Sequence, residues 1–144
     1  MNVKQYPAVV IHSVADARRV LAFGQPVTLL SARGAALFAG SGWWRALLRR
    51  IREEHRDIAI ADILDCADAS GLALGALRIG QLAIVLDAAA PGWSSVASIA
   101  ASLGGEVLIV RPPALDMSNP AEAWRLKDWL EAHAAPGDSG PTVS

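Results

Sequence analysis

The chain has 144 residues, of which 53% are hydrophobic and 19% charged, and its formal net charge at pH 7 is −1. This length suits one domain, the apolar composition excludes intrinsic disorder, and the small net charge provides no general attraction to nucleic acid or to an anionic membrane. The single cysteine, Cys66, excludes an intramolecular disulfide, and the amino-terminal residues lack the apolar core of a secretory signal. We therefore expect a cytoplasmic protein that neither crosses a membrane nor binds nucleic acid.

The first part of the chain predicts two strands separated by a helix. Residues 8–11 are a short apolar run typical of a strand, and residues 14–23 carry apolar side chains at helical spacing up to Gly24. Ser13 precedes this helix as a natural N-cap. Residues 27–30 are the second predicted strand, which leads into a turn at 31–34.

The middle of the chain predicts two more helices around a third strand. Residues 43–55 have an amphipathic pattern that turns Trp44 and Ile51 inward and the arginines outward. The third strand covers 58–64, and the helix at 71–79 follows it. That helix is apolar on nearly every face, so we expect it to be buried on all sides.

The last part of the chain predicts two further strands, at 82–86 and 107–110, with a helix at 94–103 between them. The prolines at 112 and 113 cannot donate ladder hydrogen bonds, so sheet pairing is expected to end there. Asn119, Pro120 and Glu122 match the start of a final helix that continues to about residue 133. Residues 135–144 are expected to be a flexible tail.

The predicted helices end at Gly24, Gly80 and Gly104 shortly before a strand. Glycine suits the left-handed residue that ends a helix, and strands apolar on both faces are typical of a parallel sheet covered by helices. The order of elements indicates successive βα units with right-handed crossovers. We expect a single α/β domain over residues 1–134, with about five mostly parallel strands and helices on both faces in a flavodoxin-like open sheet. The alternative is a half βα barrel that closes by dimerisation.

Polar residues follow each predicted strand at its carboxyl end. These ends share one edge of a parallel sheet, which is where α/β proteins bind ligands. His12 and Asp65 are the candidate acid or base residues at this edge. The candidate ligand-binding residues are Ser31, Arg33, Asp68, Asp87 and Arg111. The competing interpretation is that such side chains only cap the helices that follow.

Asp62 lies inside the third predicted strand. A buried carboxylate is costly unless it is paired, so we expect Asp62 to be a third acid or base candidate or the centre of a structural hydrogen bond, with Arg33 or Arg111 as its partner. Residues three apart in a strand point to opposite faces, so Asp62 and Asp65 are not expected to share a metal ion. No metal site is predicted.

Three weaker patterns favour structural roles. Cys66 would need a base such as His12 beside it to act as a nucleophile, and a free cysteine at a strand end is more often a small buried apolar residue. The turns at 31–34 and 40–42 precede helices, whose free amides attract anions, but neither has the spacing of a phosphate-binding motif. The arginines of segment 45–56 are diluted by glutamates, which is typical of a solvated helix face.

These observations leave two functions open. The first is a small α/β protein that binds an anionic or carbonyl metabolite at the carboxyl edge of the sheet. The second is a non-catalytic oligomerising or regulatory domain, in which the apolar helices at 71–79 and 94–103, or the last helix, bind a partner. The high apolar fraction favours a homo-oligomer in either case. The sequence identifies no cofactor and does not decide whether the protein is an enzyme.

Overall fold

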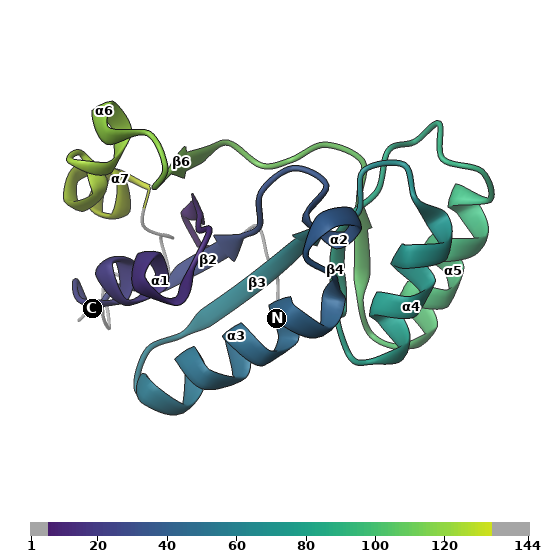
Figure 1. Ribbon diagram of the computed structural model, residues 1–144, viewed down its shortest axis with the longest axis horizontal. Coiled ribbons are helices and arrows are strands. Elements are labelled where there is room, and N and C mark those ends of the chain that lie inside the picture. Colours follow the sequence, from purple (N-terminus) through teal and green to yellow (C-terminus); the bar gives the residue numbers. More distant parts are fainter. Residues whose placement is uncertain (1–5, 134–144) are drawn as a thin grey trace, which may run out of the picture.

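Six short strands form one parallel sheet in the computed structural model, which describes residues 6–133 (Figure 1). The strands are β1 (Ala8–Val10), β2 (Val27–Leu30), β3 (Ile60–Asp65), β4 (Ala83–Val85), β5 (Glu106–Leu108) and β6 (Ala114–Asp116). All five neighbouring pairs are parallel. This open parallel sheet in a single α/β domain confirms the predicted fold class. The predicted tail at 135–144 lies outside the described residues.

The strand order is β5-β4-β3-β2-β1-β6. In the flavodoxin-like order, 2-1-3-4-5, the second strand lies on one side of the first strand and the later strands are added on its other side. In this protein β1 to β5 lie side by side in sequence order, and only β6 is added on the other side of β1. The carboxyl ends of β1 and β6 therefore lie next to each other at the point where the order of the strands reverses.

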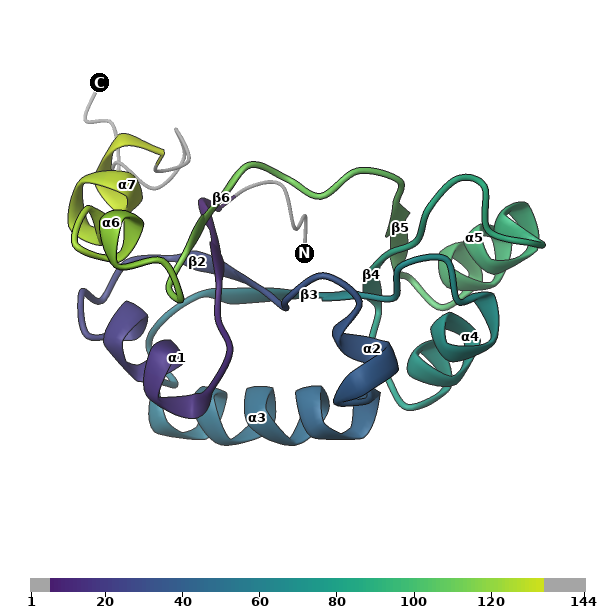
Figure 2. The same ribbon diagram turned by 45° about the horizontal axis from the view of Figure 1, so that its top comes forward.

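The helices pack around the sheet, and the buried side chains of α1, α3, α4, α5 and α7 belong to one apolar cluster. They are α1 (Val14–Leu21), α2 (Ala35–Phe38), α3 (Ser41–Glu54), α4 (Ser70–Arg78), α5 (Trp93–Ser102), α6 (Pro120–Ala123) and α7 (Leu126–Ala132). Figure 2 shows α1, α3 and α4 below the sheet, whereas α6 and α7 lie above the level of β2 and β3, near β6. Ser13 caps α1 as predicted, because its hydroxyl accepts a hydrogen bond from the Asp16 N–H at 3.1 Å.

Alternation along the strands divides the buried apolar residues into two clusters. Val9, Leu29 and Ile84 belong to the larger cluster, which includes the inward side chains of α1, α3, α4 and α5. Their strand neighbours Val10 and Leu30 belong to a smaller cluster on the opposite face of the sheet. Strands that are buried on both faces need apolar side chains at every position, which explains the unbroken apolar runs in the sequence.

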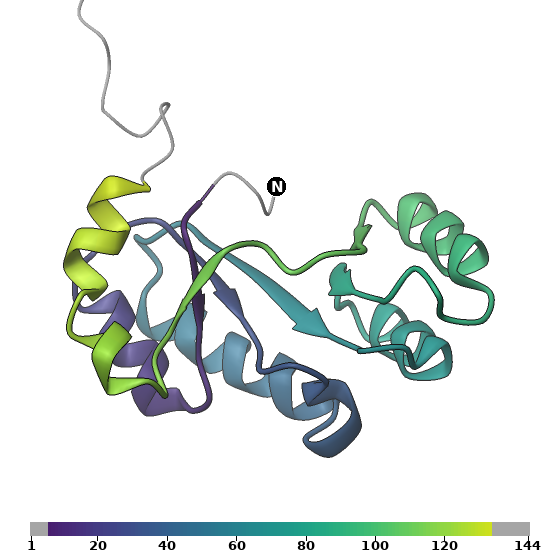
Figure 3. The same cartoon turned by 90° about the horizontal axis from the view of Figure 1, so that it is seen from above.

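The segment between β5 and β6 crosses the sheet. In Figures 2 and 3 it passes over β3 and β2 on its way to β6, and Arg111 within it bonds to groups at the ends of both strands. The expectation that pairing ends at the two prolines is therefore wrong. The ladder between β5 and β4 ends at Leu108, before the prolines. After the prolines, β6 pairs with β1 at the other edge of the sheet, and the Met117 N–H donates to the Val10 carbonyl at 3.0 Å.

The last predicted helix is broken into α6 and α7 at Trp124 and Arg125. Its start was predicted well, since the Asn119 side chain accepts from the Ala121 N–H and Pro120 is the first helical residue. Leu126 and Leu130 of α7 are buried, while Trp124 at the break stays exposed.

Helix α4 is not buried on all sides, contrary to expectation. Ala73, Ala76 and Leu77 face the core, but Leu72 and Ile79 are 45% and 51% exposed. The neighbouring helices α3 and α5 contact the sides of α4 and leave its outer face uncovered among the described residues. The exposed apolar side chains of α4 therefore do not contribute to the core of this domain.

Gly105 permits the close approach of β5 to β4. A Cβ atom at this position would lie 2.2 Å from the Leu82 carbonyl oxygen, which is far inside van der Waals contact.

Within residues 6–133, no helix is long and apolar enough to cross a membrane.

Candidate ligand-binding cleft

A cleft of about 500 Å³ opens at the carboxyl edge of the sheet, beside the ends of β3 and β4. It is lined by Arg33, Gly34, Asp65, Ala67, Asp68, Val85, Asp87, Ile109, Val110 and Arg111. The loops that supply these residues follow β2, β3, β4 and β5. The structure thus brings together the predicted rim residues Arg33, Asp65, Asp68, Asp87 and Arg111.

Asp65 and Arg111 form an ion pair at the floor of the cleft. Arg111 Nη1 donates to Asp65 Oδ2 at 2.7 Å, and Arg111 Nη2 donates to the Ser31 carbonyl at 3.0 Å. The other oxygen, Asp65 Oδ1, accepts from the N–H groups of Gly34 and Ala67 at 3.0 and 2.8 Å. Asp65 therefore connects the backbone of the loops after β2 and β3 to the Arg111 side chain, and its charge is already compensated.

Ser31 lies next to this ion pair and has a structural role. Its side chain is fully buried, where the hydroxyl accepts from the Asp65 N–H at 2.9 Å and donates to the Ala32 carbonyl at 3.0 Å. Ser31 does not line the cleft. The hydroxyl is instead part of the support that holds Asp65 in position.

Arg33, Asp68 and Asp87 are the exposed charged residues of the cleft. Asp87 Oδ1 accepts from the Ala89 N–H at 2.8 Å, which leaves its second oxygen available. Across residues 6–133, the side chains of Arg33 and Asp68 have no hydrogen-bond or ion-pair partner. One cation and two carboxylates therefore surround a neutralised ion pair, which suits a ligand with both an acid group and hydroxyl groups.

Ala67 is the strained residue of the cleft. Its φ of +52° is the only positive value at a non-glycine residue between positions 6 and 133. The Ala67 N–H donates to Asp65, and its carbonyl accepts from the Asp87 N–H at 2.8 Å. A left-handed alanine costs about 1 kcal/mol, and such strain is concentrated at functional sites. The hydrogen bonds on both sides of Ala67 hold the β3 and β4 loops together.

His12 lies at the end of β1, outside the cleft lining. Its Nε2 is 2.8 Å from Asp116 Oδ1 at the end of β6, and that oxygen also accepts from the N–H and hydroxyl of Ser118 at 2.9 and 2.8 Å. Burial by itself would raise the pKa of Asp116, but the hydrogen bonds from Ser118 and His12 outweigh it and hold that pKa below its usual value. The His12–Asp116 pair therefore joins the ends of β1 and β6, the two strands at which the strand order reverses.

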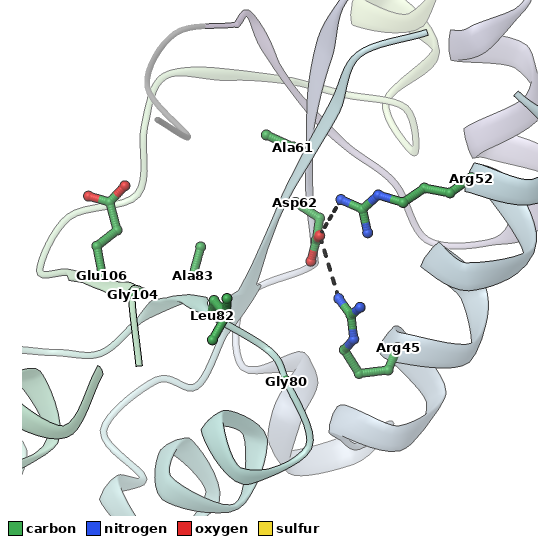
Figure 4. Close-up of a pocket in the computed structure, with 10 residues that line it drawn as sticks. Arg45, Arg52, Ala61, Asp62, Gly80, Leu82, Ala83, Gly104 and Glu106 are labelled. Atoms are coloured by element: carbon green, nitrogen blue, oxygen red, sulfur yellow. Dashed lines mark hydrogen bonds and ion pairs between the residues drawn. The ribbon is translucent and has the colours of Figure 1, made fainter. Parts of the chain in front are cut away.

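Asp62 lies on the face of β3 that packs against α3, in a second cavity of about 360 Å³ (Figure 4). Its oxygens accept from Arg52 Nη2 at 2.7 Å, Trp44 Nε1 at 2.9 Å and Gln81 Nε2 at 2.8 Å. The expected partners Arg33 and Arg111 are wrong, because both lie at the carboxyl-edge cleft. Asp62, Asp65 and His12 therefore occupy three separate places in the fold.

Cys66 is buried at the end of β3. Burial, with a smaller contribution from the neighbouring Asp65 charge, raises the pKa of the Cys66 thiol to about 12. A thiol with such a pKa stays protonated at neutral pH, which is the opposite of what a nucleophile needs. Among the described residues, no group of three or more His, Cys, Asp or Glu side chains is placed to hold a metal ion.

Sequence reasoning missed Asp116, Ala67 and the apolar wall formed by Ile109 and Val110. Asp116 follows Ala114 and Leu115, an apolar run that is too short to predict a strand directly after two prolines. Ile109 and Val110 were assigned to the last strand, but they continue past its end and line the cleft. Nothing in the sequence signals the left-handed backbone of Ala67.

No protein-family model matches the chain. No curated protein is similar to it at a significant level either.

Proposed function

We propose that the protein binds a small metabolite with an anionic group in the carboxyl-edge cleft. The observation that carries the proposal is that Arg33 and Asp68, from two different strand-end loops, line one cleft without any partner among residues 6–133. Structural polar residues in such loops normally cap helices or pair with each other. The cleft volume of about 500 Å³ is typical of small-ligand sites.

The chemistry of the lining suggests how the ligand is held. Arg33 is suited to a carboxylate or phosphate oxygen, because its guanidinium donates two parallel hydrogen bonds. Asp68 and Asp87 are suited to hydroxyl groups, since ionised carboxylates only accept hydrogen bonds. Ile109 and Val110, which are 54% and 70% exposed, also line the cleft and offer apolar contact. A hydroxy acid or a phosphorylated sugar fits this set of groups.

Native mass spectrometry of the purified protein, with a denatured control, tests the proposal. Retained mass that is lost on denaturation would give the size of the ligand. The same ligand should then bind at least tenfold more weakly to Arg33→Gln, whereas Arg19→Gln, which removes an exposed arginine on α1, should bind as the wild type does. Equal binding by both variants would show that the ligand lies elsewhere.

A second candidate function is assembly of a homo-oligomer through the β5 edge of the sheet. The observation that favours it is a set of large apolar side chains on α4, α5 and the adjoining loops that are each more than 40% exposed: Leu72, Ile79, Leu82, Ile99 and Leu103. Strand β5 is an open edge, and sheet edges readily pair with another chain. Ser98→Trp on the exposed face of α5 should dissociate such an assembly in light scattering, while Arg19→Gln should not.

We also propose that the protein works in the cytoplasm. The support is its cysteine usage, since the chain has one cysteine and that residue is buried as a free thiol. Secreted domains of this size commonly use disulfides. Fractionation of cells that express a tagged protein tests this assignment.

A further inference from the structure

Helix α3 and the turn after it carry an arginine row that the cleft proposal does not use. It consists of Arg45, Arg49 and Arg52, which are spaced four and three residues apart on one side of α3, and of Arg56 in the turn after the helix. With Glu53 they line a shallow hollow of about 330 Å³. The cavity around Asp62 adjoins this hollow, because Arg45 and Arg52 line both (Figure 4).

Two members of the row are held in place by the buried carboxylate of Asp62. Arg52 Nη2 lies 2.7 Å from Asp62 Oδ1, and Arg45 Nη1 lies 3.6 Å from the same oxygen. Figure 4 shows both side chains reaching from α3 toward β3, with Glu106 on the far wall pointing away from them. Each guanidinium has five N–H donors, so most donors of both arginines remain unused. The positions of these donors are fixed before any ligand arrives.

The other two members of the row have no such partner. No hydrogen bond or ion pair to the side chains of Arg49 and Arg56 is present within residues 6–133. By contrast, Arg50 lies 3.5 Å from Glu54, which also pairs with Arg18 at 2.6 Å. Glu54 thus compensates Arg50 of α3 and Arg18 of α1, while the row keeps an excess of positive charge over Glu53 and Asp62.

A merely solvated helix face explains exposed arginines, but it does not explain their arrangement here. The row combines two free guanidinium groups, two oriented ones and a hollow between them. Guanidinium groups bind phosphate oxygens through paired, charge-assisted hydrogen bonds, and several around one hollow can share a single polyanion. The hollow is too small for a folded macromolecule and large enough for a phosphate group with part of its carrier.

We propose that the arginine row is a binding site for the diphosphate group of a small phosphorylated molecule, separate from the carboxyl-edge cleft. Arg49 and Arg56 contact the outer oxygens, and Arg45 and Arg52 contact the inner ones. The row is on α3, whereas the cleft is lined by strand-end loops, so one site can be disabled without the other.

Isothermal titration calorimetry with inorganic pyrophosphate tests the proposal on the full chain, at low salt and again at physiological ionic strength. The double variant Arg49→Gln/Arg56→Gln should lose about tenfold or more in affinity, since it removes two charge-assisted contacts. It leaves Asp62 and its partners unchanged, and a thermal melt verifies that it folds. The control Arg19→Gln/Arg125→Gln removes the same charge from two exposed arginines, one on α1 and one at the break between α6 and α7, and should bind as the wild type does.

Three results would overturn the proposal. The first is no pyrophosphate binding by the wild type at low salt. The second is an equal loss in both double variants, which would show that the net charge of the protein controls the affinity. The third is binding of a short single-stranded RNA that excludes pyrophosphate and is tighter by an order of magnitude, which would assign the row to nucleic acid instead.

Discussion

Arg111 crosses from the β5–β6 segment to Asp65 at the end of β3, so that one ion pair holds the linker, two strand ends and the floor of the cleft together. The two side chains are only 13% and 6% exposed. Removing one partner of such a pair leaves the other charge buried without compensation. This geometry makes the pair a structural support of the cleft.

Replacing Arg111 with methionine should therefore destabilise the protein by about 3 kcal/mol, because the Asp65 carboxylate loses its cation. Urea denaturation followed by circular dichroism measures this change. The double variant Arg111→Met/Asp65→Asn should be less destabilised than the sum of the two single variants. A loss below about 1 kcal/mol for Arg111→Met, the range of exposed pairs, would contradict the structural role.

Gly105→Ala should destabilise the protein by about 1–3 kcal/mol or more, because the new Cβ meets the Leu82 carbonyl oxygen and the backbone has to move. Gly75→Ala is the matched control. Gly75 lies inside α4, where a Cβ meets nothing within 4 Å, so alanine should stabilise the helix by about 0.5–1 kcal/mol. Opposite signs in urea denaturation are expected, and a neutral Gly105→Ala would refute the close approach.

Alkaline pH should weaken the fold through Cys66. Its pKa in the folded state is about 12, above the usual thiol value of 9.0, so the unfolded chain releases the thiol proton first. Stability from this residue is therefore present below about pH 9 and declines as the pH rises from 9 toward 12. Cys66→Ala should show a smaller decline across that window. The native thiol should also react with iodoacetamide at pH 8 far more slowly than the unfolded chain does.

Acid should weaken the junction of β1 and β6 through Asp116. Its pKa is lower in the folded state, so its contribution is present above the unfolded pKa and is lost as the pH falls through the folded value. Free energies of unfolding measured from pH 6 downward should fall less steeply for Asp116→Asn than for the wild type. Asp128→Asn, an exposed residue of α7, should follow the wild-type curve.

Much of the fold was predictable because local signals and the global architecture agree. The apolar runs at β1, β2 and β3 and the glycine-terminated α1 and α4 appear where the sequence places them. The return of β6 to β1 was not predictable, because pairing between residues more than a hundred positions apart has no local signature. Helix α6 was recognised from Asn119 and Pro120, whereas the break after it was not, because neither Trp124 nor Arg125 is a glycine or proline that would signal it.

The candidate site was predictable in outline and not in detail. Arg33, Asp68 and Asp87 were found because every parallel strand ends at the same edge. The sequence could not show that Ser31 is buried or that Asp62 pairs with Trp44 and Arg52, because both depend on which face a residue presents once the register is set. The consequence for mutagenesis is that Asp68 is a cleaner probe of binding than Asp65.

The late return of β6 has a consequence for biosynthesis. A nascent chain can assemble β1 to β5 in the order in which they leave the ribosome, because each new strand adds beside the previous one. During all that time the outer edge of β1 has no neighbour, although β1 is synthesised first. Exposed strand edges attract other chains, so the half-made protein passes through a period of vulnerability to aggregation that ends only when residues 114–116 emerge.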